Sequence, residues 1–199
     1  SDNFLAVSGA NQAVTVTPTA SGGVDISHTD ANSLAAAAGG TVTATIVAGT
    51  TVDQLKTLYD TSETNAYTIT IDNADATGST AAEFNTINSA TSVAINAAAV
   101  TALSGTASDV ATLMSAATDA DQFTGASFDS VAANGLSITG TAIDVTDLNN
   151  ALSRTTSVSN NTVLATFANA QGGITVSGGT AAEFDTLLSL EGTNVNITG

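Results

Sequence analysis

The side chains in this sequence that could do acid–base or metal chemistry are carboxylates. The chain has one histidine, His28, and no cysteine, so neither a nucleophile–base pair nor a thiolate metal site can be assembled from it. We therefore interpret His28 as a turn residue. Neighbouring carboxylates make calcium the one candidate cofactor, although neither EF-hand nor nonapeptide spacing is present. The weak calcium candidates are Asp72, Asp75, Asp119 and Asp121.

The charge balance excludes several classes of function. The 199 residues include 18 Asp and Glu against 2 Lys and Arg, which gives a formal net charge of -16. Such a chain is repelled by phosphate backbones and by anionic membrane surfaces. The two basic residues, Lys56 and Arg154, lie too far apart in the sequence to complete an acidic catalytic cluster. We therefore predict no enzyme activity, no catalytic residues, no nucleic-acid partner and no membrane insertion.

Helix starts are the strongest local signal. The segment Thr80-Ala81-Ala82-Glu83-Phe84 recurs 100 residues later as Thr180-Ala181-Ala182-Glu183-Phe184. In a Thr-x-x-Glu box each side chain satisfies a free amide of the first helical turn, so Glu83 and Glu183 are interpreted as capping residues and not as a catalytic pair. The residues predicted to cap helices are Asp30, Thr51, Thr80, Glu83, Thr106, Asp109, Thr124, Asp144, Asn160, Thr180 and Glu183.

Short alternating segments precede most of these caps and predict strands. In 67–72, for example, Ile69 and Ile71 alternate with Thr68 and Thr70, which is typical of a strand with one buried face. Similar segments lie near residues 25–27, 42–47, 93–96, 136–139, 157–159 and 174–177, with further ones at 14–17 and 195–198.

One strand and one capped helix in about 21 residues favour a repeated βα unit with parallel strands and right-handed crossovers. We therefore predict an α/β fold, an elongated right-handed solenoid shaped like a leucine-rich repeat, with its helices on one sheet face. The alternative is a parallel β-helix with short helical corners. Residues 1–199 are expected to form a single solenoid domain, a segment of a longer array or a filament subunit.

The outward strand positions of this fold carry mainly hydroxyl groups. Such a strip could recognise a glycan, ice or a partner surface, which makes the chain a binding module in the alternative functional interpretation. The residues of this candidate ligand face are Thr43, Thr45, Thr68, Thr70, Ser137, Thr139, Thr175 and Ser177.

The two ends of the predicted stack show no polar capping repeat, which solenoids normally need. Exposed end strands invite addition of further strands, so self-association is the expected partnership. The candidate assembly ends are Val14, Val16, Val195 and Ile197.

The segment Thr-Ala-Leu-Ser-Gly-Thr-Ala-Ser-Asp-Val-Ala-Thr-Leu at 101–113, together with Tyr-Thr-Ile-Thr-Ile at 67–71, resembles repeat tracts of very long secreted surface proteins of bacteria, notably marine cyanobacteria. The resemblance implies an extracellular or cell-surface protein that is structural or adhesive. The expected function is a structural repeat in a surface layer (S-layer), filament or adhesin stalk that assembles end to end. The Gly-Gly-x-Gly-x-Asp calcium repeats of such proteins are missing, so their calcium chemistry is not implied.

Overall fold

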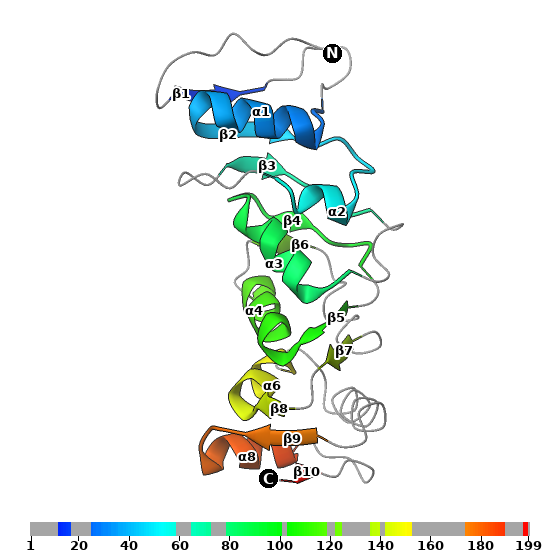
Figure 1. The fold of residues 1–199 in the computed structure, drawn as a ribbon, viewed down its shortest axis with the longest axis vertical. Helices are drawn as coiled ribbons and strands as arrows, with labels where there is room; N and C mark the ends of the chain where they lie inside the picture. The colour runs from blue at the N-terminus through cyan, green and yellow to red at the C-terminus, as the bar shows by residue number, and fades with distance from the viewer. Residues whose placement is uncertain are drawn as a thin grey trace.

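The computed structural model describes the chain in ten stretches that follow one another along an elongated molecule. Strand β1 (Gln12–Thr15) lies at one end of the long axis and strand β10 (Ile197–Thr198) at the other (Figure 1). The described residues are 12–16, 25–58, 65–72, 79–100, 103–118, 122–124, 136–139, 142–152, 174–189 and 197–198.

The helices are short and begin at side chains that cap them. Thr51 and Thr80 each accept a hydrogen bond from the backbone amide three residues on, and the side chains of Gln54 and Glu83 in turn accept one from the cap residue's own amide. These reciprocal bonds satisfy amides that have no partner inside the helix. The helices are α1 (His28–Ala38), α2 (Val52–Leu55), α3 (Ala81–Ser89), α4 (Ala107–Thr118), α6 (Val145–Ala151) and α8 (Ala181–Ser189).

One predicted cap is misplaced. The first helix begins three residues earlier than expected, because Ser27 is its N-cap and accepts from the amide of Asp30 over 3.1 Å. Asp30 instead lies in the first turn, where its carboxylate accepts the Ser27 hydroxyl proton at 2.7 Å. A serine followed three residues later by an acid is similar to the Thr-x-x-Glu segments, so the sequence held this signal.

Three further predicted caps sit at described helix starts. Thr106 accepts from the amide of Asp109 over 3.1 Å, immediately before α4. Asp144 caps α6 by accepting from the amides of Thr146 and Asp147. Thr180 and Glu183 repeat the Thr80–Glu83 box before α8.

The strands are two to seven residues long and every described pairing between them is parallel. Besides β1 and β10 they are β2 (Gly39–Thr45), β3 (Ala66–Thr68), β4 (Ile95–Asn96), β5 (Leu103–Thr106), β6 (Phe123–Thr124), β7 (Leu136–Thr139), β8 (Ala142–Asp144) and β9 (Ile174–Ser177).

The prediction of an elongated right-handed solenoid with strand–helix repeats of about 21 residues is wrong. The described strands form four small parallel sheets with the orders β1-β2-β3, β10-β9-β8, β4-β6 and β5-β7. Two of these sheets skip a strand of the chain, and paired residues are not 21 positions apart: Ala44 pairs with Tyr67, and Leu103 with Leu136. The parallel β-helix alternative fails with it. The chain is a mixed α/β protein with short strands.

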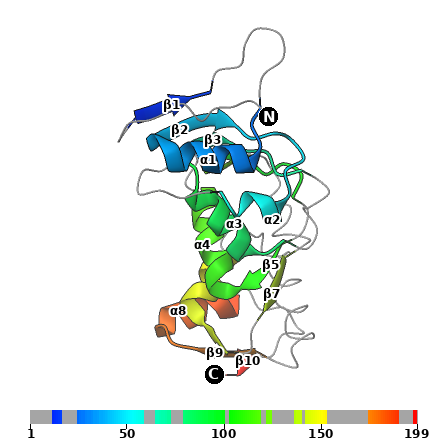
Figure 2. The same cartoon turned by 45° about the horizontal axis from the view of Figure 1, so that its top comes forward.

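Helices and strands differ in width, which bears on the division of the strands into separate sheets. A helix with its side chains is about 10 Å wide, whereas neighbouring strands lie about 4.8 Å apart. One helix for each strand therefore fits beside one continuous sheet only if the sheet curves. The strand ladder breaks instead, and the helices follow one another along the molecule (Figures 1 and 2).

The core lies between the helices and the strands. In β2 and just after it, Val42, Ala44 and Ile46 are buried while Thr43 is exposed, as the alternation of a half-buried strand requires. Aromatic and aliphatic side chains fill the layer. The largest fully buried side chains are Tyr67, Phe84, Leu55, Ile69, Ile71, Ile87, Ile95, Leu103, Leu113, Met114 and Ile138.

Two buried polar side chains take the place of strand backbone. The Thr91 hydroxyl accepts from the Tyr67 amide at 2.9 Å and donates to the Tyr67 carbonyl at 2.7 Å. The Asn65 side-chain oxygen accepts from the Val42 amide at 2.9 Å. These bonds satisfy strand groups that would otherwise be buried without partners.

Candidate functional site

The strand register brings outward-facing polar side chains of different strands side by side. Thr45 of β2 pairs with Thr68 of β3, and Asn96 of β4 pairs both with Thr70 and with Thr124 of β6. All are exposed except Thr45, which is half-buried. We call Thr43, Thr45, Thr68, Thr70, Asn96 and Thr124 the hydroxyl face.

The hydroxyl face has a regular spacing. Paired residues on neighbouring strands are about 4.8 Å apart, and outward residues two apart along one strand are about 6.6 Å apart. Thr43 and Thr45, like Thr68 and Thr70, supply two outward positions from one strand segment. The face can therefore offer hydrogen bonds to a ligand that itself repeats on a scale of a few ångströms.

Sequence reasoning missed two members of this face. Asn96 was not considered, and Thr124 was predicted to cap a helix but lies in strand β6; the helix expected after it falls outside the described residues. The alternation of Ile95, Asn96 and Ala97 was the signal that could have identified the first.

The other predicted ligand-face residues do not join the hydroxyl face. Ser137 and Thr139 pair with Ser104 and Thr106 in the separate β5–β7 sheet. Thr175 and Ser177 lie in β9, in the sheet near the opposite end of the molecule from β1. The expected single strip is thus divided among three sheets.

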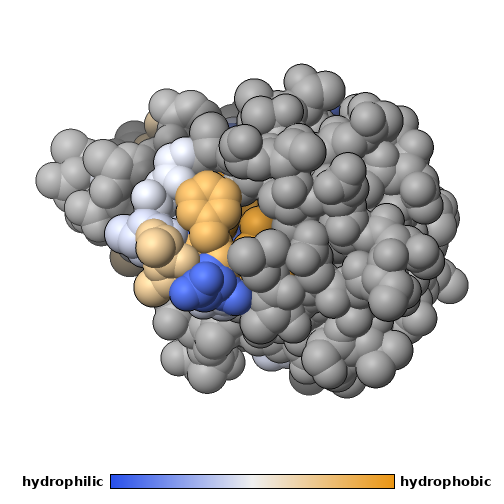
Figure 3. Space-filling view, turned by 90° about the horizontal axis from the view of Figure 1, so that it is seen from below, coloured by the Kyte–Doolittle hydropathy of each residue, from blue (hydrophilic) through white to orange (hydrophobic). Residues whose placement is uncertain are grey.

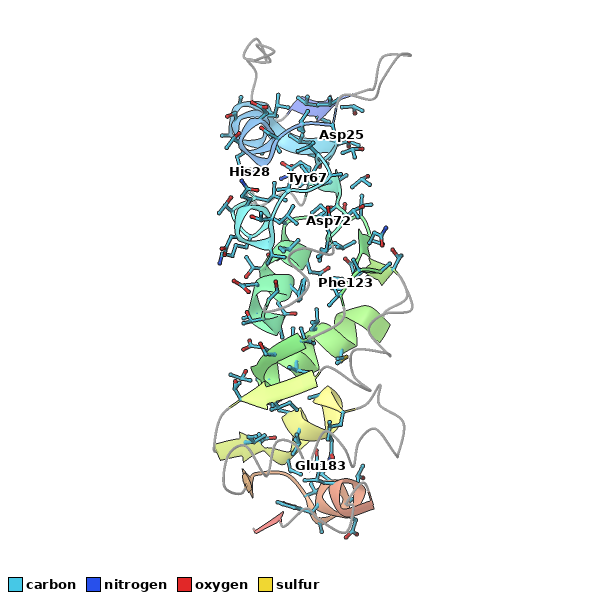
Figure 4. All side chains as sticks on the ribbon, turned by 90° about the vertical axis from the view of Figure 1, so that its right-hand side faces the viewer. Asp25, His28, Tyr67, Asp72, Phe123 and Glu183 are labelled. Carbon is cyan, nitrogen blue, oxygen red and sulfur yellow. The ribbon has the colours of Figure 1, made fainter. Side chains whose placement is uncertain are left out.

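Charged groups close to the hydroxyl face are acidic. Asp72 follows Thr70 by two residues and is exposed. Figure 4 shows Asp25 and Asp72 on the side of the molecule away from α1 and α2. These carboxylates would repel a negatively charged ligand from the hydroxyl face.

The described basic side chain, Lys56, belongs to the helix layer. Its Nζ atom lies 2.5 Å from Asp53 Oδ1 and 2.9 Å from Glu83 Oε1, so it joins α2 to the cap of α3. These two contacts, Asp53 first, raise the pKa of Lys56 above its usual value. The contact with Lys56, helped by the Thr80 amide, lowers the pKa of Glu83.

Glu183 occupies the equivalent place in the first turn of α8, where its described partners are hydroxyl and amide groups. Its Oε1 atom accepts the hydroxyl proton of Thr146 in α6 at 2.7 Å, and Oε2 accepts from the Thr180 amide at 2.7 Å. These bonds lower the pKa of Glu183, the Thr146 bond most. Glu83 therefore links α2 to α3, and Glu183 links α6 to α8. The two carboxylates do not converge on one groove.

The predicted calcium ligands are mostly outside the described residues. Asp72 is exposed, while Asp75, Asp119 and Asp121, like the predicted cap Asn160, fall in undescribed segments. Within the stretches that the structure describes, no three His, Cys, Asp or Glu side chains gather to hold a metal. His28 is half-buried at the first position of α1.

The candidate assembly ends lie where the described strand ladders stop. Val14 in β1 and Val16 just after it are half-buried and pack against the core. Ile197 is in β10, and Val195 falls outside the described residues. Among the described strands β1 pairs with β2 alone, and β10 with β9 alone.

Searches of protein-family models, curated proteins and solved structures give no match to this chain. Over the described residues, no helix is both long enough and apolar enough to cross a bilayer. The features left to indicate a function are the hydroxyl face and the edges of β1 and β10, each paired on one side among the described strands.

Proposed function

We propose that this chain is a non-enzymatic, extracellular structural protein that assembles end to end, with β1 of one copy adding to β10 of the next. The observation that carries the proposal is the position of these two strands. Each is bonded on one side only among the described strands, and they lie at opposite ends of the long axis (Figure 1). An unpaired edge is a template for another strand.

Contact between two different ends generates an open-ended assembly. Such a head-to-tail interface produces a filament unless its rotation closes a ring. The net charge of -16 keeps the sides of neighbouring filaments apart, while the backbone groups that pair at the ends are themselves uncharged. A surface layer, filament or adhesin stalk needs these properties.

The open side of β1 provides a sharp test. The Val16 amide donates inward to the Thr43 carbonyl at 2.9 Å, and successive amides of a strand alternate in direction, so the Thr15 amide points to the open side. Thr15→Pro removes this outward donor and keeps the bond to β2, since proline is tolerated on the free side of an edge strand. Thr15→Val keeps the donor and is the matched control.

Assembly is measured by sedimentation velocity over a range of concentrations and by electron microscopy of the full chain. We expect the parent protein and Thr15→Val to form filaments at high concentration, and Thr15→Pro to remain monomeric. Filaments of Thr15→Pro as abundant as those of the parent would overturn strand addition at β1. A parent that stays monomeric at every concentration would contradict the proposed function.

The register of the hydroxyl face supports a second function, recognition of a repetitive surface such as ice or a crystalline glycan. Thr68→Lys places a long charged chain in the middle of the face, and Thr86→Lys makes the same change at an exposed position of α3. Inhibition of ice recrystallisation and co-sedimentation with insoluble polysaccharides are the measurements. A ligand bound equally by both variants would show that the hydroxyl face is not the binding surface.

A further inference from the structure

Helices α3 and α8 have nearly the same sequence but different surroundings. In α3, Ala81 and Phe84 are fully buried, and a Cβ atom placed on Gly105 of β5 would come within 3.0 Å of the Ala81 Cβ atom. In α8 the equivalent Ala181 is exposed and Phe184 is half-buried. Figure 3, which views the β10 end, shows apolar side chains at that surface. The face of α3 that packs toward β5 and α4 therefore has an exposed counterpart in α8.

A repeated contact links α3 to α4 and α6 to α8. The fifth residue after the N-cap reaches a neighbouring helix: Asn85 donates to the Asp109 carbonyl, and Asn149 to the Glu183 carbonyl, each over 2.9 Å. In both cases the acceptor is the third residue after the next cap.

The first two helices make variants of the same contact. Asn32, five residues after the Ser27 cap, donates to the Thr57 carbonyl at the end of α2. Lys56, five residues after the Thr51 cap, reaches Glu83, the third residue after its own cap. The fifth position thus carries a hydrogen-bond donor in α1, α2, α3 and α6, whereas in α4, which packs against α6, it is the buried Ala111.

In α8 the fifth residue after Thr180 is Asp185, which is exposed and, when ionised, has no proton to donate. The helix that would follow α8 in an end-to-end assembly can be identified from spacing. Ile26, just before α1, pairs beside β2 on the side where β1 also pairs, so α1 starts level with β1. Addition of β1 to β10 places α1 of that copy two strand spacings beyond β9, from which α8 begins. This distance of about 9.6 Å matches the 8–10 Å between packed helices.

We propose that the outer face of α8, formed by Ala181, Phe184 and Asp185, docks against α1 of a second copy, and that Asp185 weakens this docking. The third residue after the α1 cap is Asp30, which is exposed. The interface therefore sets Asp185 against Asp30, whereas Asn85, Asn149 and Lys56 meet the equivalent position of their neighbouring helices. This inference rests on the proposed end-to-end assembly and assigns the residue that limits it.

Two substitutions test whether Asp185 weakens the docking of α8 against α1. Asp185→Asn restores the donor found at Asn85 and Asn149, and Asp185→Lys recreates the Lys56–Glu83 pairing against Asp30. Each is expected to lower the concentration at half-assembly by roughly tenfold, the effect of one additional hydrogen bond. Asp72→Asn changes the net charge by the same amount as Asp185→Asn, at an exposed position away from both ends, and is expected to leave that concentration unchanged.

The location of the interface is tested separately on α8. Ala181→Arg places a large side chain on the docking face and should prevent assembly. Ala182→Arg adds the same group one residue on, at a position whose counterpart Ala82 stays exposed beside α4. Both sites are exposed in the single chain, so the fold should survive, which circular dichroism checks.

The outcomes separate this inference from the proposed function. If the parent forms filaments and Ala181→Arg or Asp185→Asn leaves their formation unchanged, the α8–α1 interface is wrong and end-to-end assembly stands. If the parent is monomeric but Asp185→Asn assembles, the result supports the weakening effect of Asp185 and contradicts assembly of the parent itself. If neither assembles, both fail.

Discussion

Asn149 in α6 donates its side-chain amide to the Glu183 carbonyl in α8, with 2.9 Å between the two atoms. Asn85 makes the equivalent bond from α3 to Asp109 in α4. The amide oxygens of both asparagines are buried without a hydrogen-bond partner. Each of these side chains therefore stabilises the contact between two helices through its donor group, whereas its buried acceptor group lowers the stability of the fold.

Replacing Asn149 with aspartate should destabilise the fold more than replacing it with alanine. Aspartate puts an oxygen against the Glu183 carbonyl, whereas alanine removes the bond together with the buried unpaired oxygen. We expect Asn149→Asp to lower the free energy of unfolding by about 1–3 kcal/mol. Urea denaturation followed by circular dichroism gives the value. Asn150→Asp, at an exposed neighbouring position, should change it little; equal losses at both positions would show that the inter-helix bond is not the cause.

Removal of one capping hydroxyl should be measurable on its own. Thr80→Ala leaves the Glu83 amide without its Thr80 acceptor at 3.3 Å and should cost about 1 kcal/mol of stability. Thr86→Ala removes an exposed hydroxyl inside the same helix and is the control. A loss for Thr86→Ala as large as that for Thr80→Ala would mean that general helix propensity, and not the cap, accounts for the effect.

The Lys56–Glu83 contact gives a signed pH dependence. The pKa of Glu83 is lower in the folded chain than its ordinary value of 4.5, so its contribution to stability is present above that value and is lost as the pH falls through the folded pKa. Glu83 is partly exposed, which limits this contribution to about 0.5 kcal/mol. We expect the parent to lose more stability than Glu83→Gln between pH 6 and pH 3, roughly the range around carboxyl titration.

The matched control for this pH profile is Asp25→Asn, which removes an exposed carboxylate outside the Lys56 contact. Its stability should fall with acid as steeply as that of the parent. Parallel profiles for the parent and Glu83→Gln would contradict a favourable Lys56–Glu83 interaction.

Two glycines with positive φ should respond differently to alanine. Gly49 has a φ of 81° with open space around it, so Gly49→Ala should cost about 1 kcal/mol through backbone strain alone. Gly179 has a φ of 74°, and an added Cβ atom there would collide with Val145. Gly179→Ala should therefore lose a further 1–3 kcal/mol or so by overpacking. Thermal denaturation of both variants is the comparison, and a Gly49→Ala loss equal to or above that of Gly179→Ala would refute it.

The helix starts were the part of the fold that local sequence could predict. Capping depends on side chains three residues apart, as at Thr51 with Gln54 and Thr80 with Glu83. Ser27 was overlooked because the anchor pattern counted back four residues from Leu34 to Asp30. The inter-helix role of Asn85 and Asn149 was also missed, although an asparagine five residues after the cap was the available signal.

Sheet order could not be read from the sequence in the same way. The pairing of Leu103 with Leu136 joins residues that are far apart, and the choice among partners depends on how helices about 10 Å wide fit beside strands about 4.8 Å apart. The composition of the hydroxyl face followed from this pairing. Thr70, Asn96 and Thr124 became neighbours only through the register between their strands.

The hydroxyl of Thr91, which bonds both the amide and the carbonyl of Tyr67, has an evolutionary consequence. A single side chain of this kind completes the hydrogen bonding of a buried strand, so the segment beside it is released from the need to supply extended backbone. Such a segment can gain or lose residues through mutation without exposing an unpaired peptide group in the core. Proteins that use such a side chain can therefore vary the length of the segment between two strands, which strictly periodic proteins cannot do.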